Sequence, residues 1–74
     1  MNRQRRKQIE KDFELIGEAE DILESTKSEE QDAYDNLSEN FQYGKRGEEM
    51  QNYIEMLDES IGYLSDAKSV VEQI

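Results

Sequence analysis

Carboxylates are the most numerous side chains with chemical potential in this sequence, which holds 19 Asp and Glu residues and no His. Acids stand next to each other in pairs such as Glu29–Glu30 and Glu48–Glu49. Because neighbouring residues point in different directions on a helix, such pairs do not bring two carboxylates to one reacting atom. The acidic residues therefore do not predict a general acid–base site.

The sequence also offers few side chains suited to metal binding or nucleophilic catalysis. The chain has no Cys and no His, the usual ligands of zinc and copper. Asp32, Asp35 and Glu39 offer oxygen ligands, but they lack the spacing and the glycine of an EF-hand loop. No glycine-rich phosphate cradle occurs. We therefore expect a protein that is not an enzyme, with no catalytic residue, metal ligand or cofactor.

The charge is unevenly spread along the chain. The net charge is −10, but residues 1–11 carry five basic side chains and one acidic one, a local charge of +4 that leaves −14 for the rest. Two interpretations of this basic head stay open. It binds phosphate, or it lies beside the C-terminal end of a second helix, where Glu72, the chain carboxylate and the helix dipole are negative. The basic side chains of the head are Arg3, Arg5, Arg6, Lys7 and Lys11.

The acidic remainder repels nucleic acid and anionic membranes, so direct binding to either is not expected. A solvated surface that keeps a small helical protein soluble is one explanation of this charge, and mimicry of DNA phosphates is another. No stretch approaches the ~20 apolar residues of a membrane span. The basic head lacks the apolar core of a signal peptide. These features predict a cytoplasmic protein.

Two apolar ladders at helical spacing predict the fold. Residues three and four apart lie on one face of an α-helix. One cluster of turn residues separates the two series, which predicts a single all-α domain over residues 1–74. We expect an antiparallel, coiled-coil-like hairpin with helices over about 3–34 and about 45–73. The first ladder is Ile9, Phe13, Ile16 and Leu23, with Leu15, Ala19 and Ile22 alongside, and the second is Met50, Ile54, Leu57, Ile61, Leu64 and Val71.

The connector, about residues 35–47, is expected to form an ordered cap. Ser38 can satisfy free N–H groups at the start of a short helical turn. Leu37 and Phe41 flank that turn as an approximate hydrophobic staple. They are therefore expected to close the end of the hairpin.

Polar residues interrupt both ladders at matching heights. Glu20 and Lys68 each stand where an apolar residue is needed. If Phe13 lies level with Val71, the numbers of facing residues add up to 84, and the two interruptions fall one turn apart. A contact between Glu20 and Lys68 would then select the register of the helices more than it would stabilise them.

Further apolar residues lie outside the ladders and predict partners. Met56, Tyr63 and Val70 are spaced seven apart, roughly 100° from the centre of the second ladder. A two-helix hairpin has one seam and a marginal core, so we expect a homodimer that forms a four-helix bundle through this second stripe. Scattered surface apolar residues are the alternative. Tyr43, near Arg46, has the composition of a binding hot spot, and it is expected either to meet a protein partner or to pack back on the second helix.

The middle third of the chain carries a motif with a resemblance. Residues 29–39 read EEQDAYDNLSE, followed by Gln42 and by RGEEM at residues 46–50. This run resembles short, acidic, uncharacterised helical-hairpin proteins of bacteriophages and prophages. Ser38 stands where those proteins typically have proline, and Gly44 and Lys45 stand near their usual capping serine. The resemblance implies a phage-related origin and a binding role without an active site.

We interpret the chain as a small, non-catalytic protein-binding module. On this interpretation it is a phage or prophage accessory protein that binds a host or phage protein stoichiometrically in the bacterial cytoplasm. One alternative is an acidic nucleic-acid mimic that inhibits a DNA- or RNA-binding enzyme. Another is a protein that sequesters a small ligand between protomers, which an acidic, phosphate-repelling surface disfavours. The sequence does not identify the partner.

Overall fold

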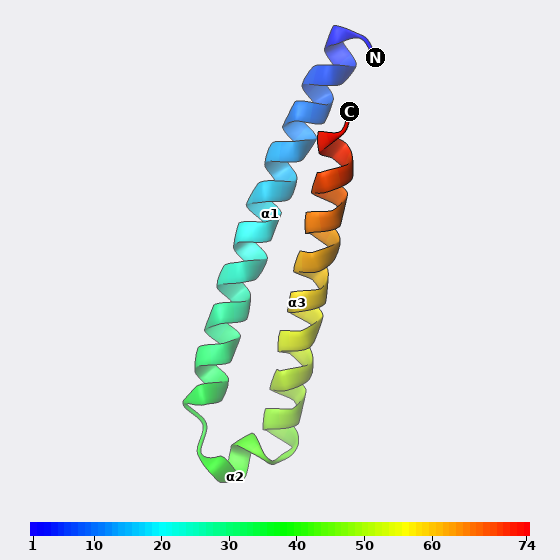
Figure 1. The fold of residues 1–74 in the computed structure, drawn as a ribbon. Coiled ribbons are helices and arrows are strands. Elements are labelled where there is room, and N and C mark those ends of the chain that lie inside the picture. Colours follow the sequence, from blue (N-terminus) through cyan, green and yellow to red (C-terminus); the bar gives the residue numbers. More distant parts are fainter.

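The computed structural model describes all residues, 1–74, and its regular structure is entirely helical. Helix α1 spans Arg3–Asp35, α2 spans Glu39–Gln42 and α3 spans Lys45–Glu72. The two long helices lie antiparallel, α2 forms the bend at one end, and both termini lie at the other (Figure 1). The predicted all-α hairpin is confirmed. The bounds of its long helices lie within one residue of those that the periodicity predicts.

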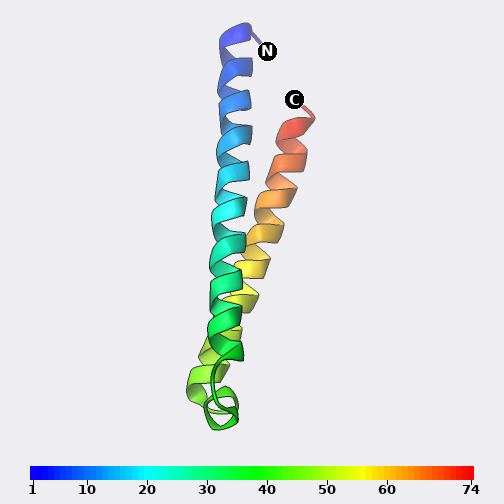
Figure 2. The ribbon, with the colours of Figure 1, turned by 90° about the vertical axis from the view of Figure 1, so that its left-hand side faces the viewer.

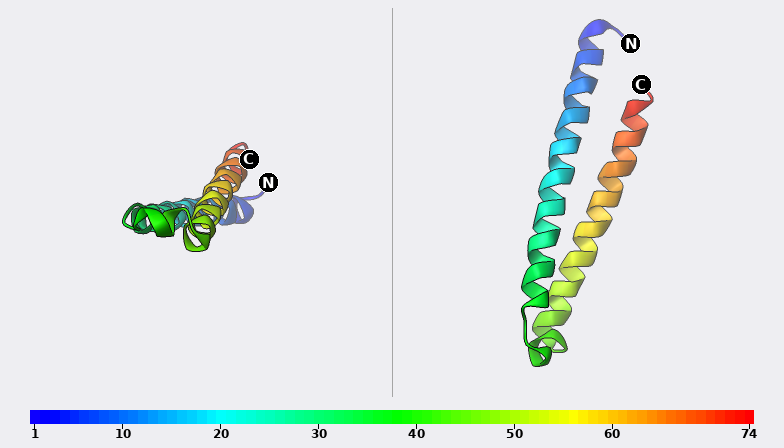
Figure 3. Two further views of the ribbon diagram at one scale, coloured as in Figure 1. Left: turned by 90° about the horizontal axis from the view of Figure 1, so that it is seen from below. Right: turned by 60° about the vertical axis from the view of Figure 1, so that its left-hand side comes forward.

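The hairpin is a thin rod of 58 × 15 × 12 Å. Its radius of gyration is 17.1 Å, whereas a compact domain of this length has a radius of about 11 Å. The long helices are inclined to one another and separate toward the termini (Figures 2 and 3). We call the end that holds the termini the open end and the end that holds α2 the loop end.

Local capping explains where α1 begins. The side-chain oxygen of Asn2 accepts a hydrogen bond from the backbone N–H of Arg5 at 2.9 Å. Asparagine is among the best residues for this purpose, because a short polar side chain satisfies an N–H group that has no partner within the helix. The cap offsets the unfavourable placement of basic residues in the first turns, near the positive end of the helix dipole.

The seam between α1 and α3 follows a seven-residue repeat. We letter its positions a to g, with Phe13 and Ile54 at position a. Every residue of α3 that is at least partly shielded from solvent falls at a or d, and so does every such residue of α1 except Gly17 and Ala19. Only Gly47 and Met50 are fully buried. The seam residues are Ile9, Phe13, Ile16, Glu20, Leu23, Lys27, Glu30 and Tyr34 of α1, and Gly47, Met50, Ile54, Leu57, Ile61, Leu64, Lys68 and Val71 of α3.

Glu20 and Lys68 form an ion pair within this seam, as predicted. The Nζ atom of Lys68 lies 3.1 Å from Oε1 of Glu20 and 5.3 Å from the centroid of the Phe13 ring. The Glu20 side chain is 18% exposed, and its Oε1 atom is enclosed without a well-aligned hydrogen bond. The charge of Lys68 therefore compensates a carboxylate that would otherwise be costly to shield from water.

A second set of polar contacts fixes the register nearer the loop end. Lys27 donates a hydrogen bond of 2.7 Å to Asp58, and the side chain of Gln51 donates one of 2.8 Å to the Tyr34 hydroxyl. In both pairs the residue numbers add up to 85, which is one more than the sum of 84 predicted for facing residues. The hydrogen bond to Asp58 raises the pKa of Lys27. The pair's contribution to stability is therefore complete below the ordinary pKa of 10.5 and is lost as the pH rises through the raised value.

The connector packs on α3 through its backbone. Gly47, in the first turn of α3, is buried, and a Cβ atom there would lie 2.6 Å from the carbonyl oxygen of Phe41 and still closer to that of Gln42. The side chain of Gln42 also donates a hydrogen bond of 3.1 Å to the carbonyl oxygen of Tyr34. Direct backbone contact and this bond hold α2 against both long helices.

Two predictions for the connector are wrong in detail. Ser38 does occupy the N-cap position of α2, but its side chain makes no capping hydrogen bond. Phe41 is 59% exposed and does not close the hairpin, whereas Leu37 is half-buried. The physical reason is the missing side chain at Gly47, because it lets the backbone of α2 approach α3 directly and leaves Phe41 outside that contact.

Gly47→Ala is expected to lower the free energy of unfolding by about 1–3 kcal/mol, because the added methyl group overlaps the α2 backbone. Gly62→Ala is the matched control. A Cβ atom there meets nothing within 4 Å, so alanine should stabilise α3 by about 0.5–1 kcal/mol. Thermal unfolding followed by circular dichroism measures both changes. Stabilisation by both substitutions would contradict the backbone packing of the connector.

Candidate interaction surfaces

Large apolar side chains recur at position c of both long helices. Leu15 and Ile22 hold this position in α1, and Met56, Tyr63 and Val70 hold it in α3. All five are between 48% and 66% exposed. Position c lies about 130° from the centre of the seam at 100° per residue, further than the roughly 100° expected from the ladder, so these side chains cannot enter the seam.

The two series lie on the same side of the hairpin. The two long helices run in opposite directions. In such an antiparallel pair, the g positions of both helices lie on one side of the seam, and the e positions of both lie on the other side. Position c adjoins g on the helix surface. The g positions that lie among the exposed apolar residues are Ala19, Thr26, Tyr53, Ser60 and Ala67.

The central part of this side of the rod carries no charge. No c or g residue is charged from Leu15 to Thr26 of α1 or from Tyr53 to Val70 of α3, although 38% of the chain is charged. We call these residues the uncharged face. They are Leu15, Ala19, Ile22, Thr26, Tyr53, Met56, Ser60, Tyr63, Ala67 and Val70.

Most polar groups of the uncharged face already have partners within the chain. The hydroxyls of Thr26 and Ser60 donate to carbonyl oxygens four residues earlier in their own helices, at 2.8 and 2.9 Å. The Tyr63 hydroxyl donates to a carboxylate oxygen of Glu59 at 2.9 Å. Burying a polar group is costly only when it loses its hydrogen bonds. This face can therefore be covered by a protein surface at little desolvation cost.

The opposite side of the rod is acidic. Positions e and b, which lie on that side, carry half of the carboxylates of the long helices. Two mid-helix glycines, Gly17 and Gly62, also lie there. The carboxylates are those of Glu10, Glu14, Asp21, Glu24, Asp35, Glu48, Glu55, Asp58 and Glu72. The hairpin thus separates an acidic side from an uncharged one.

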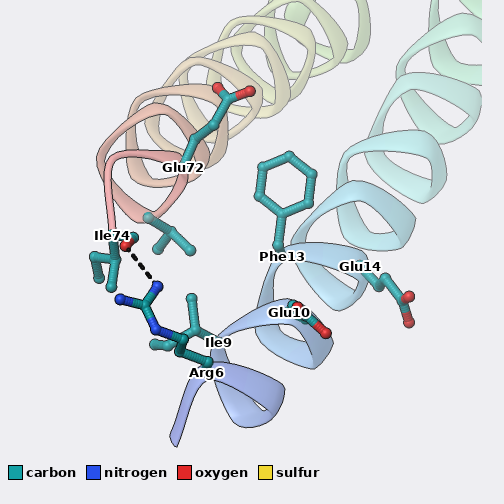
Figure 4. Close-up of a pocket in the computed structure, with 8 residues that line it drawn as sticks. Arg6, Ile9, Glu10, Phe13, Glu14, Glu72 and Ile74 are labelled. Carbon is teal, nitrogen blue, oxygen red and sulfur yellow. Dashed lines mark hydrogen bonds between the residues drawn. The ribbon is translucent and has the colours of Figure 1, made fainter. Parts of the chain in front are cut away.

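A cleft of about 510 Å³ lies between the long helices at the open end (Figure 4). Arg6 reaches across it and donates a hydrogen bond of 3.3 Å to the main-chain oxygen of Ile74. This residue of the basic head thus meets the C-terminal end of α3, as one of the two interpretations requires. An anionic ligand would face three carboxylates at the cleft. The lining residues are Arg6, Ile9, Glu10, Phe13, Glu14, Val71, Glu72 and Ile74.

The loop end presents a second group of exposed side chains. Tyr43 is 87% exposed, so within the single chain it does not pack back on α3. Phe41 and Arg46 are exposed beside it. The sequence pointed to Tyr43 and Arg46 as partner-binding residues but assigned Phe41 to the hairpin cap, because the position of Phe41 depends on the backbone contact at Gly47.

Comparison with known proteins gives no match to a family model, to a curated protein sequence or to a solved structure. Neither long helix has a stretch sufficiently long and apolar to cross a lipid bilayer.

Phe41→Ala and Tyr43→Ala are each expected to change the free energy of unfolding by less than about 0.5 kcal/mol, because both side chains are mostly in water. Leu37→Ala is the control and should lower it by about 1 kcal/mol or more, because Leu37 is half-buried. Urea unfolding of the three variants measures this. A loss at Phe41 equal to that at Leu37 would show that Phe41 closes the hairpin after all.

Proposed function

We propose that this chain is a non-catalytic protein-binding module that acts by stoichiometric association. In this proposal the uncharged face joins two hairpins into a four-helix bundle, and the exposed loop end meets a protein partner. The observation that carries the proposal is the uncharged face itself. An exposed apolar surface of this extent is typical of interaction sites and is unfavourable on a free monomer.

The amount of exposed surface supports self-association. The chain exposes 5900 Å², whereas a compact monomer of its 8.7 kDa mass exposes about 4,700 Å². The excess, roughly 1,200 Å², is more than the ~800 Å² that each partner contributes to an interface of standard size. Pairing of two hairpins would bring the exposed area per chain into the range of an ordinary folded domain.

The loop end supports a second, heterologous contact. Tyr43 and Arg46 belong to the residue types that dominate binding energies at interfaces, and Phe41 adds apolar area next to them. The motif that resembles phage and prophage proteins includes this connector. We therefore propose an accessory protein of a phage or prophage, located in the cytoplasm of the bacterial host, that binds a host or phage protein through its loop end.

The acidic side favours one other function. Its carboxylates recur along one side of a rod of 58 Å, which is the arrangement that a mimic of nucleic-acid phosphates needs. Such a mimic would inhibit a DNA- or RNA-binding enzyme, and its affinity would fall steeply with salt. An apolar interface would keep its affinity. Sequestration of a small anionic ligand has less support, because carboxylates line the cleft at the open end.

Val70→Lys is expected to abolish self-association, because it places a charge within the buried contact. Ser69→Lys is the matched control, since it makes the same change of charge one residue away on the acidic side. Sedimentation equilibrium should give twice 8.7 kDa for the native chain and for Ser69→Lys, and 8.7 kDa for Val70→Lys. A native chain that stays monomeric and cooperatively folded at high micromolar concentration would disprove the dimer.

A further inference from the structure

The charge of the rod is polarised along its length. At the open end, residues 1–11 and 66–74 hold six basic and three acidic side chains, a net charge of +3. At the loop end, residues 29–49 hold two basic and seven acidic side chains, a net charge of −5. The rod is 58 Å long, whereas electrostatic interactions in physiological salt decay over about 8 Å. The two ends therefore cannot compensate each other within one chain.

Most of the basic head is unpaired. Arg6 is the only member whose side chain forms a hydrogen bond with the C-terminal segment, at the main-chain oxygen of Ile74. The remaining four, Arg3, Arg5, Lys7 and Lys11, are exposed and form no ion pair. These cations are available to a partner.

The boundary of the uncharged face has the same sense of polarity as the rod ends but a smaller difference in charge. Arg5, at position g, borders it at the open end, and Lys11 lies just beside it at position f. Glu29 and Glu49, both at position c, border it at the loop end, with Asp32 beside them at position f. Residues of the other sign also stand on this boundary, Asp12 and Asp66 at the open end and Lys45 and Arg46 at the loop end, so the boundary is neutral at the open end and keeps a net charge of −1 at the loop end.

We propose that a second copy of this chain covers the uncharged face in a head-to-tail orientation, with the basic head of each copy against the loop end of the other. The inference rests on the proposed self-association and adds its orientation. A parallel arrangement would bring two basic heads together at one end and two acidic loop ends together at the other. The head-to-tail arrangement places opposite charges together at both ends, so electrostatics selects it.

The spacing along α1 agrees with this orientation. When α1 of one copy runs antiparallel to α1 of the other with Leu15 facing Ile22, the numbers of facing residues add up to 37. Arg5 then lies level with Asp32, and position 8 lies level with Glu29. The contact that aligns the apolar residues thus also places Arg5 of one copy against Asp32 of the other. The two loop ends, each with an exposed Tyr43, point in opposite directions, so the pair offers two identical surfaces to protein partners.

Charge reversal tests the orientation. Arg5→Glu with Lys11→Glu reverses the head, and Glu29→Lys with Asp32→Lys reverses the loop end. Each pair alone should raise the dissociation constant of the homodimer at low salt by about tenfold or more, and the four changes combined should restore it to within about threefold of the native value. Arg3→Glu with Lys7→Glu is the matched control, because it makes the same change of charge on the opposite side of the head and should have little effect. Sedimentation equilibrium provides the constants.

The outcomes separate the orientation from the proposed function. A native chain that dimerises, with head-reversed and loop-reversed forms that dimerise equally well, would overturn the head-to-tail orientation and leave self-association standing. Equal weakening by the head reversal and by its control would also overturn it, because net charge would then explain the effect. A native chain that never dimerises would overturn the proposed self-association itself.

Crosslinking provides a second test that does not depend on charge. The native chain has no cysteine, so Gln8→Cys and Glu29→Cys each introduce a unique thiol at position c. Oxidation of an equimolar mixture should give mainly the disulfide between the two variants, because these positions face each other head to tail. Each variant oxidised alone should remain largely uncrosslinked. Efficient crosslinking of either variant to itself, with little of the mixed product, would overturn the orientation.

Discussion

A single antiparallel seam holds this chain together, and the limited burial that one seam provides constrains the rest of the molecule. Only Gly47 and Met50 are fully buried, and every other seam residue keeps part of its surface in water. A domain of this size with disulfides or a metal could compensate for such a small core. This chain has no cysteine or histidine, so further stabilisation has to come from additional apolar contact. The uncharged face is the surface that can supply it.

The polar residues within the seam determine how the two helices align. An apolar ladder alone tolerates a shift of one heptad, because apolar side chains would still meet apolar side chains. Such a shift would separate Glu20 from Lys68 and Lys27 from Asp58, and it would leave the enclosed carboxylate of Glu20 without its counter-charge. The register in turn determines which c residues of α1 and α3 lie at the same level along the rod. A continuous uncharged face therefore depends on ion pairs that contribute little stability themselves.

Periodicity in the sequence was sufficient to predict the long helices, their direction and, to within one residue, their register. These features are repeated over many residues, so no single position decides them. The connector could not be predicted in the same way, because the placement of Phe41 depends on one close backbone approach at Gly47. A glycine in the first turn of a helix was the available signal, since a helix former would be preferred there without a packing reason. The sequence also contains the information that the exposed apolar residues of both helices lie on one side of the hairpin. This becomes visible only when heptad positions are assigned to both helices as an antiparallel pair.

The distribution of charge also limits how far association can proceed. An apolar face that met a different surface of the next molecule would propagate into a fibre, whereas a face that meets its own copy closes into a pair. Each hairpin has only one uncharged face, and its other side carries carboxylates along the rod. Two copies paired in the proposed way would cover both apolar faces and present acidic sides outward, where mutual repulsion opposes further stacking. The same negative charge would thus keep the assembly small, and the loop ends would remain its main exposed apolar surfaces.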